Sequence, residues 1–174
     1  EQLERNFGVS FIGWHDLFRE KGLKSLSNLD LNIWGSVEWE KTALNRFYRG
    51  RVYGSGLDDV YRHSKIVINF HHPTETSNGT NLRDFESTSN GALLISDYKP
   101  TLADLFVENK EIVFYRDINE LPDLVSYYLK NEKERSVIAK AGQTAVLTNH
   151  TIESRVKGMM KIIESSVNIS KHDK

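Results

Sequence analysis

Short apolar runs of strand length alternate with helical patterns along the chain, and this alternation restricts the fold more than any other feature of the sequence. Several of the runs are nearly continuous and rich in β-branched residues, which is typical of strands buried on both faces of a parallel sheet. Six runs occur, at residues 9–13, 29–35, 51–53, 65–70, 92–96 and 111–115. We therefore predict an α/β fold with a doubly wound, mostly parallel, six-stranded sheet and helices on both faces.

The C-terminal part of the chain has the periodicity of helices. One apolar stripe with helical spacing consists of Leu121, Leu124, Val125, Tyr128 and Leu129. From Asp117 onward we predict helices only, the last of them over residues 151–166. Residues 1–166 are expected to form one domain, and the polar residues 167–174 a flexible tail. The chain begins abruptly at Glu1, so we expect it to be a fragment of a longer protein.

Composition excludes several classes of function. The chain of 174 residues has no cysteine, which excludes disulfides, thiolate zinc sites and cysteine nucleophiles. Its net charge of −1 offers no bulk attraction for nucleic acid or an anionic membrane. No apolar run is long enough to span a bilayer, and no leader with a basic start and an apolar middle is found. A cytoplasmic, soluble domain is the expectation.

Ligands of doubly wound sheets bind beyond the carboxyl ends of the strands, and the loop after residues 65–70 is the most informative of these. It leads into a helix that we predict to begin at Thr80. The unpaired amides and partial positive charge of a helix start favour an anion, and Gly79 lets a ligand approach the backbone. Arg83 adds charged donors for a phosphate. Glu86 follows on the same face, and a carboxylate there suits the neighbouring hydroxyls of a ribose.

Other interpretations of the same residues remain open. Arg83 and Glu86 also have the spacing of a surface ion pair, worth less than about 1 kcal/mol. His71 and His72 suggest a metal site, but adjacent side chains at a strand end diverge and no third ligand is indicated, so no metal is predicted. The chain lacks a G-x-G-x-x-G motif after its first run, a P-loop lysine motif and a G-x-S-x-G elbow.

A longer pattern extends over nearly the whole chain. Its centre is Asn69 followed by Asn81-x-Arg83-x-Phe85-Glu86-x-x-x-x-Gly91-Ala92-x-Leu94-Ile95-x-Asp97. It continues through Leu102-x-x-Leu105-Phe106, Glu111-Ile112-Val113-x-Tyr115 and the segment RSVIAKAG, and it reaches back to Phe11-Ile12-Gly13. This pattern resembles the C-terminal half of group-1 glycosyltransferases of the GT-B fold, in the branch grouped with spore-maturation proteins.

The resemblance implies a Rossmann-like domain that holds a nucleotide-sugar donor. Glu86 matches the second member of the family's paired glutamates, which binds the ribose hydroxyls, while the position of the first member is occupied here by Asn78. The remaining residues that the resemblance assigns are the backbone of Gly79, Thr80 and Asn81 for the diphosphate, Arg19 and Lys21 for the charge of the leaving group, and Tyr53 and Gly54 for the base.

The expected activity is glycosyl transfer, hexosyl or related, from a UDP- or GDP-sugar without a metal or other cofactor. Arg19, Arg83 and Glu86 are the expected catalytic residues, and a missing N-terminal domain is expected to bind the glycan or other acceptor. The isolated domain is then expected to transfer little by itself. Two alternatives stay open: a non-catalytic binding or scaffolding module, which Asn78 favours, and a nucleotide-sugar epimerase on the same fold.

Overall fold

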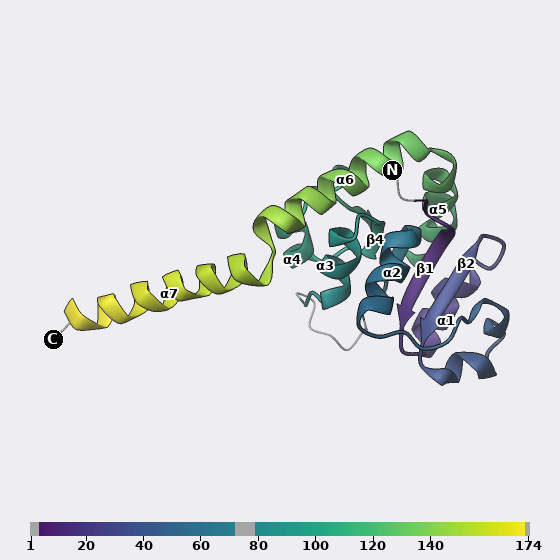
Figure 1. Ribbon diagram of the computed structural model, residues 1–174, viewed down its shortest axis with the longest axis horizontal. Helices are drawn as coiled ribbons and strands as arrows, with labels where there is room; N and C mark the ends of the chain where they lie inside the picture. The colour runs from purple at the N-terminus through teal and green to yellow at the C-terminus, as the bar shows by residue number, and fades with distance from the viewer. Residues whose placement is uncertain (1–3, 72–78, 173–174) are drawn as a thin grey trace.

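The computed structural model describes residues 4–71 and 79–172, with side chains described as far as residue 166. Its strands are β1 (Phe7–Gly13), β2 (Leu31–Gly35), β3 (Ser64–Asn69), β4 (Leu93–Asp97) and β5 (Val113–Tyr115). Its α-helices are α1 (Leu17–Lys24), α2 (Ser55–His63), α3 (Leu82–Ser89), α4 (Pro100–Leu105), α5 (Leu121–Lys130), α6 (Glu132–Asn149) and α7 (Ile152–His172) (Figure 1). Three short 3-10 helices are η1 (Val37–Lys41), η2 (Asn45–Phe47) and η3 (Ile118–Glu120).

The strands form one parallel sheet in the order β2-β1-β3-β4-β5. Val9 of β1 lies opposite Leu31 on one side and Ile66 on the other, and Ile66 lies opposite Leu93. Strand β2 lies on one side of β1, and β3, β4 and β5 follow one another on its other side. The strand order therefore reverses between β1 and β3, which is where sheets of this kind bind ligands.

The predicted strand at residues 51–53 is wrong, so the described sheet has five strands and not six. Gly50 and Gly54 flank this segment with φ values of 98° and 56°, and such left-handed turns direct the chain away from a regular strand path. Tyr48 makes a single isolated bridge to Ile33 before the chain turns away. Arg51 and Tyr53 are both exposed, so this segment lacks the two-sided burial that holds the other strands in the sheet.

Helices cover both faces of the sheet, as predicted, because successive strand residues point to opposite sides. Phe11, Ile66 and Ile68 belong to a core cluster that α1 and α5 cover. Val67 packs toward α2 and Leu94 toward α4 and the C-terminal half of α6. The buried residues of α5 are Leu121, Val125 and Tyr128, which confirms the predicted stripe.

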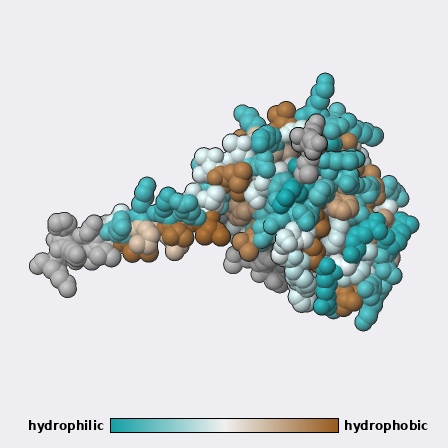
Figure 2. All heavy atoms as spheres, in the orientation of Figure 1, coloured by the Kyte–Doolittle hydropathy of each residue, from teal (hydrophilic) through white to brown (hydrophobic). Residues whose placement is uncertain are grey.

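Helix α7 extends away from the rest of the domain as an arm (Figure 1). It continues to His172, beyond the predicted end at residue 166. Figure 2 shows hydrophobic side chains along one side of the arm, and the exposed large apolar residues there include Ile152, Met159 and Ile162. Among the helices of the described ranges, none combines the length and the apolar character needed to cross a membrane.

Candidate functional site

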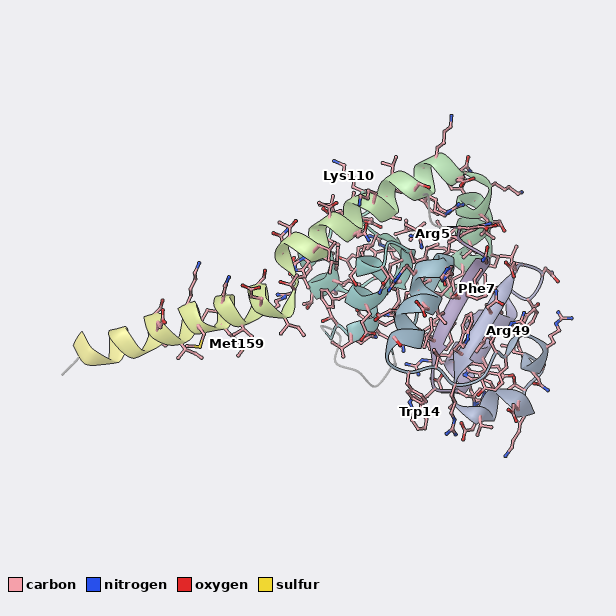
Figure 3. The ribbon with its side chains drawn as sticks, viewed as in Figure 1. Arg5, Phe7, Trp14, Arg49, Lys110 and Met159 are labelled. Atoms are coloured by element: carbon pink, nitrogen blue, oxygen red, sulfur yellow. The ribbon has the colours of Figure 1, made fainter. Side chains whose placement is uncertain are left out.

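A cleft of about 450 Å³ opens at the carboxyl ends of β1 and β2, beside the point where the strand order reverses. Figure 3 shows Trp14 beyond the carboxyl end of β1, at the opposite end of the sheet from Arg5. The cleft is lined by segments that follow β1 and β2, by the segment that leads into α2, and by the first turns of α3. Among its lining residues are Trp14, Arg19, Arg51, Tyr53, Tyr61, Asn81, Arg83 and Glu86.

The helix that opens onto this cleft begins slightly later than predicted. Asn81 is the N-cap of α3, and Leu82 is its first residue, so the predicted start at Thr80 is wrong. The reason is local: the Asp84 carboxylate accepts a hydrogen bond from the Asn81 amide at 3.0 Å, which closes a capping box one residue further along the chain. The exposed entrance of the helix is thus at Asn81 and Leu82, both of which line the cleft.

Arg83 reaches from α3 across to the ends of β1 and β3. Its guanidinium donates a hydrogen bond to the side-chain oxygen of Asn69 and lies 5.5 Å from the centroid of the Phe11 ring. The absence of a side chain at Gly13 makes room for this path, because a Cβ there would lie 3.1 Å from Arg83 Nη2 and 2.8 Å from the Phe11 ring. Burial lowers the pKa of Arg83, but a guanidinium remains charged in proteins.

Arg19 approaches the same ring from α1. Its guanidinium lies 6.0 Å from the Phe11 centroid and donates hydrogen bonds to the carbonyl oxygens of Trp14 at 3.2 Å and Phe70 at 3.3 Å. Asp16 lies 3.2 Å from its Nε. Burial is the largest cause of the lowered pKa of Arg83, and the nearby charge of Arg19 lowers it further. Two neighbouring cations at one end of the sheet favour an anion between them.

Glu86 lines the cleft one turn beyond Arg83. Both side chains lie in the described part of the chain, and they form no ion pair with each other. The alternative interpretation of Arg83 and Glu86 as a surface ion pair is therefore wrong. Burial is the largest cause of the raised pKa of Tyr61, and the neighbouring Glu86 carboxylate raises it further. Glu86 and Tyr61 thus place a carboxylate and a hydroxyl side by side in the cleft.

The structure brings together some of the predicted site residues and separates others. Arg19, Tyr53, Asn81, Arg83 and Glu86 all line the cleft, and Tyr53 is 76% exposed. The other predicted site residues that the structure describes do not line the cleft. Lys21 is exposed on α1, Gly54 is the N-cap of α2, and Gly79 and Thr80 precede α3. Lys21 follows Arg19 by two positions on a helix, and this spacing directs its side chain away from the cleft. Asn78 lies outside the described residues.

Sequence reasoning missed Trp14, Arg51 and Tyr61. Trp14 directly follows β1 and is 76% exposed at the cleft, so the rule that ligands bind beyond strand ends already pointed to it. Arg51 lies in the segment that the sequence predicts as a strand, so it was not predicted as a cleft residue. Nothing in the sequence marks Tyr61, because its contact with Glu86 depends on the packing of α2 against α3.

His71 is not at the cleft surface but fully buried. Its two ring nitrogens lie against the carboxylates of Asp84 and Asp97. With both nitrogens protonated and donating, the ring has no lone pair for a metal. His72, its neighbour in the sequence, lies outside the described residues.

The fold and the cleft define a doubly wound, Rossmann-like domain with a cationic site at its topological switch point. The chain belongs to the family described as glycosyl transferase-like, whose sequence profile matches residues 17–161. A comparison with curated protein sequences finds no match.

Solved structures share the fold at low sequence identity. HepE of Anabaena, solved with UDP-glucose, has a TM-score of 0.73 at 9% identity over 92% of this chain and 49% of its own. TarM of S. aureus has a TM-score of 0.66 at 14% identity over 92% of this chain and 36% of its own. The C-terminal domain of the group 1 glycosyl transferase LpcC of Francisella tularensis has a TM-score of 0.59 at 14% identity over 87% of this chain and 89% of its own. The chain thus corresponds to one half of the GT-B fold and spans less than half of HepE and TarM.

Proposed function

We propose that this chain is the donor-binding domain of a glycosyltransferase and that its cleft holds a nucleoside-diphosphate sugar, such as a UDP- or GDP-sugar. The observation that carries the proposal is the convergence of Arg19, Arg83 and Glu86 on one cleft at the switch point of the sheet. Two cations and a helix entrance suit a diphosphate, and a carboxylate one turn deeper suits the hydroxyls of the attached ribose.

The chemistry follows from where charge develops during transfer. Cleavage of the bond between sugar and diphosphate leaves positive charge on the sugar and negative charge on the departing diphosphate. Arg19 and Arg83 stabilise that leaving group directly, because fixed cations in a partly buried site act strongly on developing charge. This arrangement needs no metal ion to complete the charge balance. Tyr53 and Trp14, both exposed at the rim, offer aromatic faces for the base or a sugar.

The comparisons support the donor class. HepE, whose fold matches, is described with UDP-glucose and with UDP. Since this chain covers only 49% of HepE, we propose that the acceptor, a glycan or another molecule, binds mainly to a further domain. Hexosyl transfer and membership of the spore-maturation-protein-like branch stay predictions.

Titration of the ¹⁵N-labelled domain with UDP, GDP and their sugars tests the proposal by amide chemical shifts. We expect shifts at Asn81–Glu86 and around Arg19 with at least one of the nucleotides. Glu86→Gln should weaken binding by about tenfold or more, since a hydrogen bond to a charged group is worth about 1.5–3 kcal/mol. Lys110→Ala, an exposed cation away from the cleft, is the control that should leave affinity unchanged.

Two outcomes would contradict the proposal. One is the absence of shifts at the cleft with every nucleotide, and the other is equal binding by Glu86→Gln and the parent. Transfer by the complete polypeptide would separate an enzyme from a non-catalytic module, and conversion of the free nucleotide sugar to its epimer would indicate the epimerase instead.

A further inference from the structure

A buried histidine between two carboxylates lies directly behind the cleft. His71 follows β3, and its side chain is fully buried. Its Nδ1 lies 2.7 Å from Asp97 Oδ1 at the end of β4, and its Nε2 lies 3.0 Å from Asp84 Oδ2 in the first turn of α3. An ionised carboxylate only accepts hydrogen bonds, so both contacts are satisfied together only when both ring nitrogens carry protons.

The charges around His71 hold it in this protonated form. Burial alone lowers the pKa of the imidazole, but the hydrogen bonds and charges of Asp84 and Asp97 outweigh burial and raise the pKa from 6.5 to about 9. The other charged or titratable groups of the described elements packed around this cluster are Lys99, 3.4 Å from Asp97, and Tyr115, whose hydroxyl donates to the Asn69 carbonyl at 3.2 Å. Arg83 contacts the cluster through the side chain of Asn69 and is also influenced by the charge of Asp84.

A directed chain of hydrogen bonds leads from His71 to Arg83. Asp84 uses Oδ2 for His71 and Oδ1 for the side-chain amide of Asn69, which donates to it at 2.6 Å. Because Asp84 can only accept, Asn69 must turn its NH₂ group toward it. The Asn69 oxygen is then directed at the Arg83 guanidinium, which donates to it. Reversal of the Asn69 amide would instead point its NH₂ group at a cation.

We propose that His71 is a positioning residue for Arg83: by donating a hydrogen bond to the Asp84 carboxylate, it holds the acceptor that orients the Asn69 amide and thereby fixes the place of the guanidinium in the cleft. The inference rests on the proposed function for the identity of the ligand, a diphosphate. His71 itself is buried and does not line the cleft. Its effect should therefore appear in the binding of the phosphates and not of the nucleoside.

The test compares a nucleoside diphosphate with its nucleoside, UDP with uridine and GDP with guanosine, in isothermal titration calorimetry. His71→Gln, which removes the cation, should weaken diphosphate binding by about tenfold and change nucleoside binding by less than about twofold. The matched control is Tyr115→Phe, because it removes a hydrogen bond to the backbone of the same Asn69 while leaving its amide oriented. That variant should keep the affinity for diphosphate even if it melts at a lower temperature.

A pH series on the unaltered protein provides a test that needs no variant to fold. The ratio of diphosphate affinity to nucleoside affinity should fall as the pH rises from 8 to 10, since loss of one imidazole proton turns one of its two contacts into a repulsion. The ratio is the readout because titration of the base affects both ligands alike. Equal loss of both ligands in His71→Gln, or a ratio that stays constant with pH, would overturn the inference.

The proposed function and the inference fail separately. If the unaltered protein binds neither UDP nor GDP, the proposed function falls. The side-chain ¹⁵N resonances of Arg83 and Asn69 still test the inference in that case. They should move in His71→Gln and stay in place in Tyr115→Phe, and identical spectra for the parent and His71→Gln would refute the positioning role.

Discussion

At the scale of single residues, two of the arginines that line the cleft, Arg83 and Arg19, are held mainly by neutral groups. Arg83 donates to a neutral amide and packs on Phe11, and Arg19 donates to two backbone carbonyls. Among the described residues, Asp16 alone places a carboxylate within ion-pair distance of Arg19, and it balances part of that charge. Neutral partners fix a guanidinium in place without neutralising it, so its charge remains available to a ligand.

The buried His71 predicts a pH dependence of folding stability. A group whose pKa is raised on folding, here from 6.5 to about 9, stabilises the protein fully below pH 6.5 and loses this effect as the pH rises toward 9. At about 1.4 kcal/mol per pKa unit, the free energy of unfolding should fall by roughly 3 kcal/mol over this range. Urea denaturation at intervals from pH 6 to pH 9.5 measures it.

His71→Gln is the reference for that experiment, because its free energy of unfolding should lack this decline. Asp97 acts in the opposite direction at acid pH: its pKa is lowered on folding by His71 despite the opposing effect of burial, so its contribution is lost as the pH falls through the lowered value. Parallel curves for parent and variant above pH 6.5 would show that His71 is not the group responsible.

At the scale of elements, α6 is held against the sheet by one buried stripe. Its buried residues are Arg135, Ile138, Ala139, Gly142, Ala145 and Val146. Gly142 is the point of closest approach, because a Cβ there would lie 2.2 Å from the Glu111 carbonyl oxygen and 2.9 Å from Thr88 Cγ2. The obstacle is backbone just before β5, which cannot move aside as a flexible side chain would.

Gly142→Ala should therefore destabilise the domain although alanine is the better helix former. The substitution gains up to about 1 kcal/mol in helix propensity, but overpacking costs about 1–3 kcal/mol, so a net loss is expected. Gly158→Ala in α7 is the matched control, because nothing lies within 4 Å of a Cβ there. Chemical denaturation should show a lower midpoint for the first variant alone; an unchanged midpoint for Gly142→Ala would mean that α6 can shift away from Glu111.

At the scale of the whole molecule, a compact sheet domain carries an arm that contributes little to its core. The described side chains of α7 are almost all exposed, and those of Met159, Met160, Ile162 and Ile163 form an uncovered apolar set. Arg155 near its start lies 5.7 Å from the Phe85 ring. The arm beyond that contact is free of the core clusters of the described chain, so its apolar face increases the tendency to associate.

Truncation after Gly158 tests this division between domain and arm. Because the removed segment adds no residue to the core clusters, the free energy of unfolding should change by less than about 1 kcal/mol. Binding of a hydrophobic dye and self-association at high concentration should decrease, because the apolar set is gone. A melting temperature lowered by many degrees, measured by circular dichroism on a chain of 1–158, would show that the arm stabilises the domain.

The sequence by itself determined the class of the fold and the position of most elements. The local hydrophobic pattern of residues 65–70 and of the stripe from Leu121 to Leu129 already predicts which side chains are buried, without knowledge of distant residues. The entrance of α3 with Arg83 and Glu86 was predicted within two residues, because ligands of such sheets bind beyond the carboxyl ends of the strands. The strand at residues 51–53 failed because its short apolar pattern had no partner strand to complete it.

Only the tertiary structure decided which residues meet. Arg19 and Arg83 lie far apart in the sequence and contact the same Phe11 ring because the strand order brings β1 beside β3. The burial of His71 between Asp84 and Asp97 and the contact of Tyr61 with Glu86 likewise depend on the packing of separate elements. Periodicity encodes which face of an element is buried, whereas contacts between elements depend on strand order and crossover, which no local pattern records.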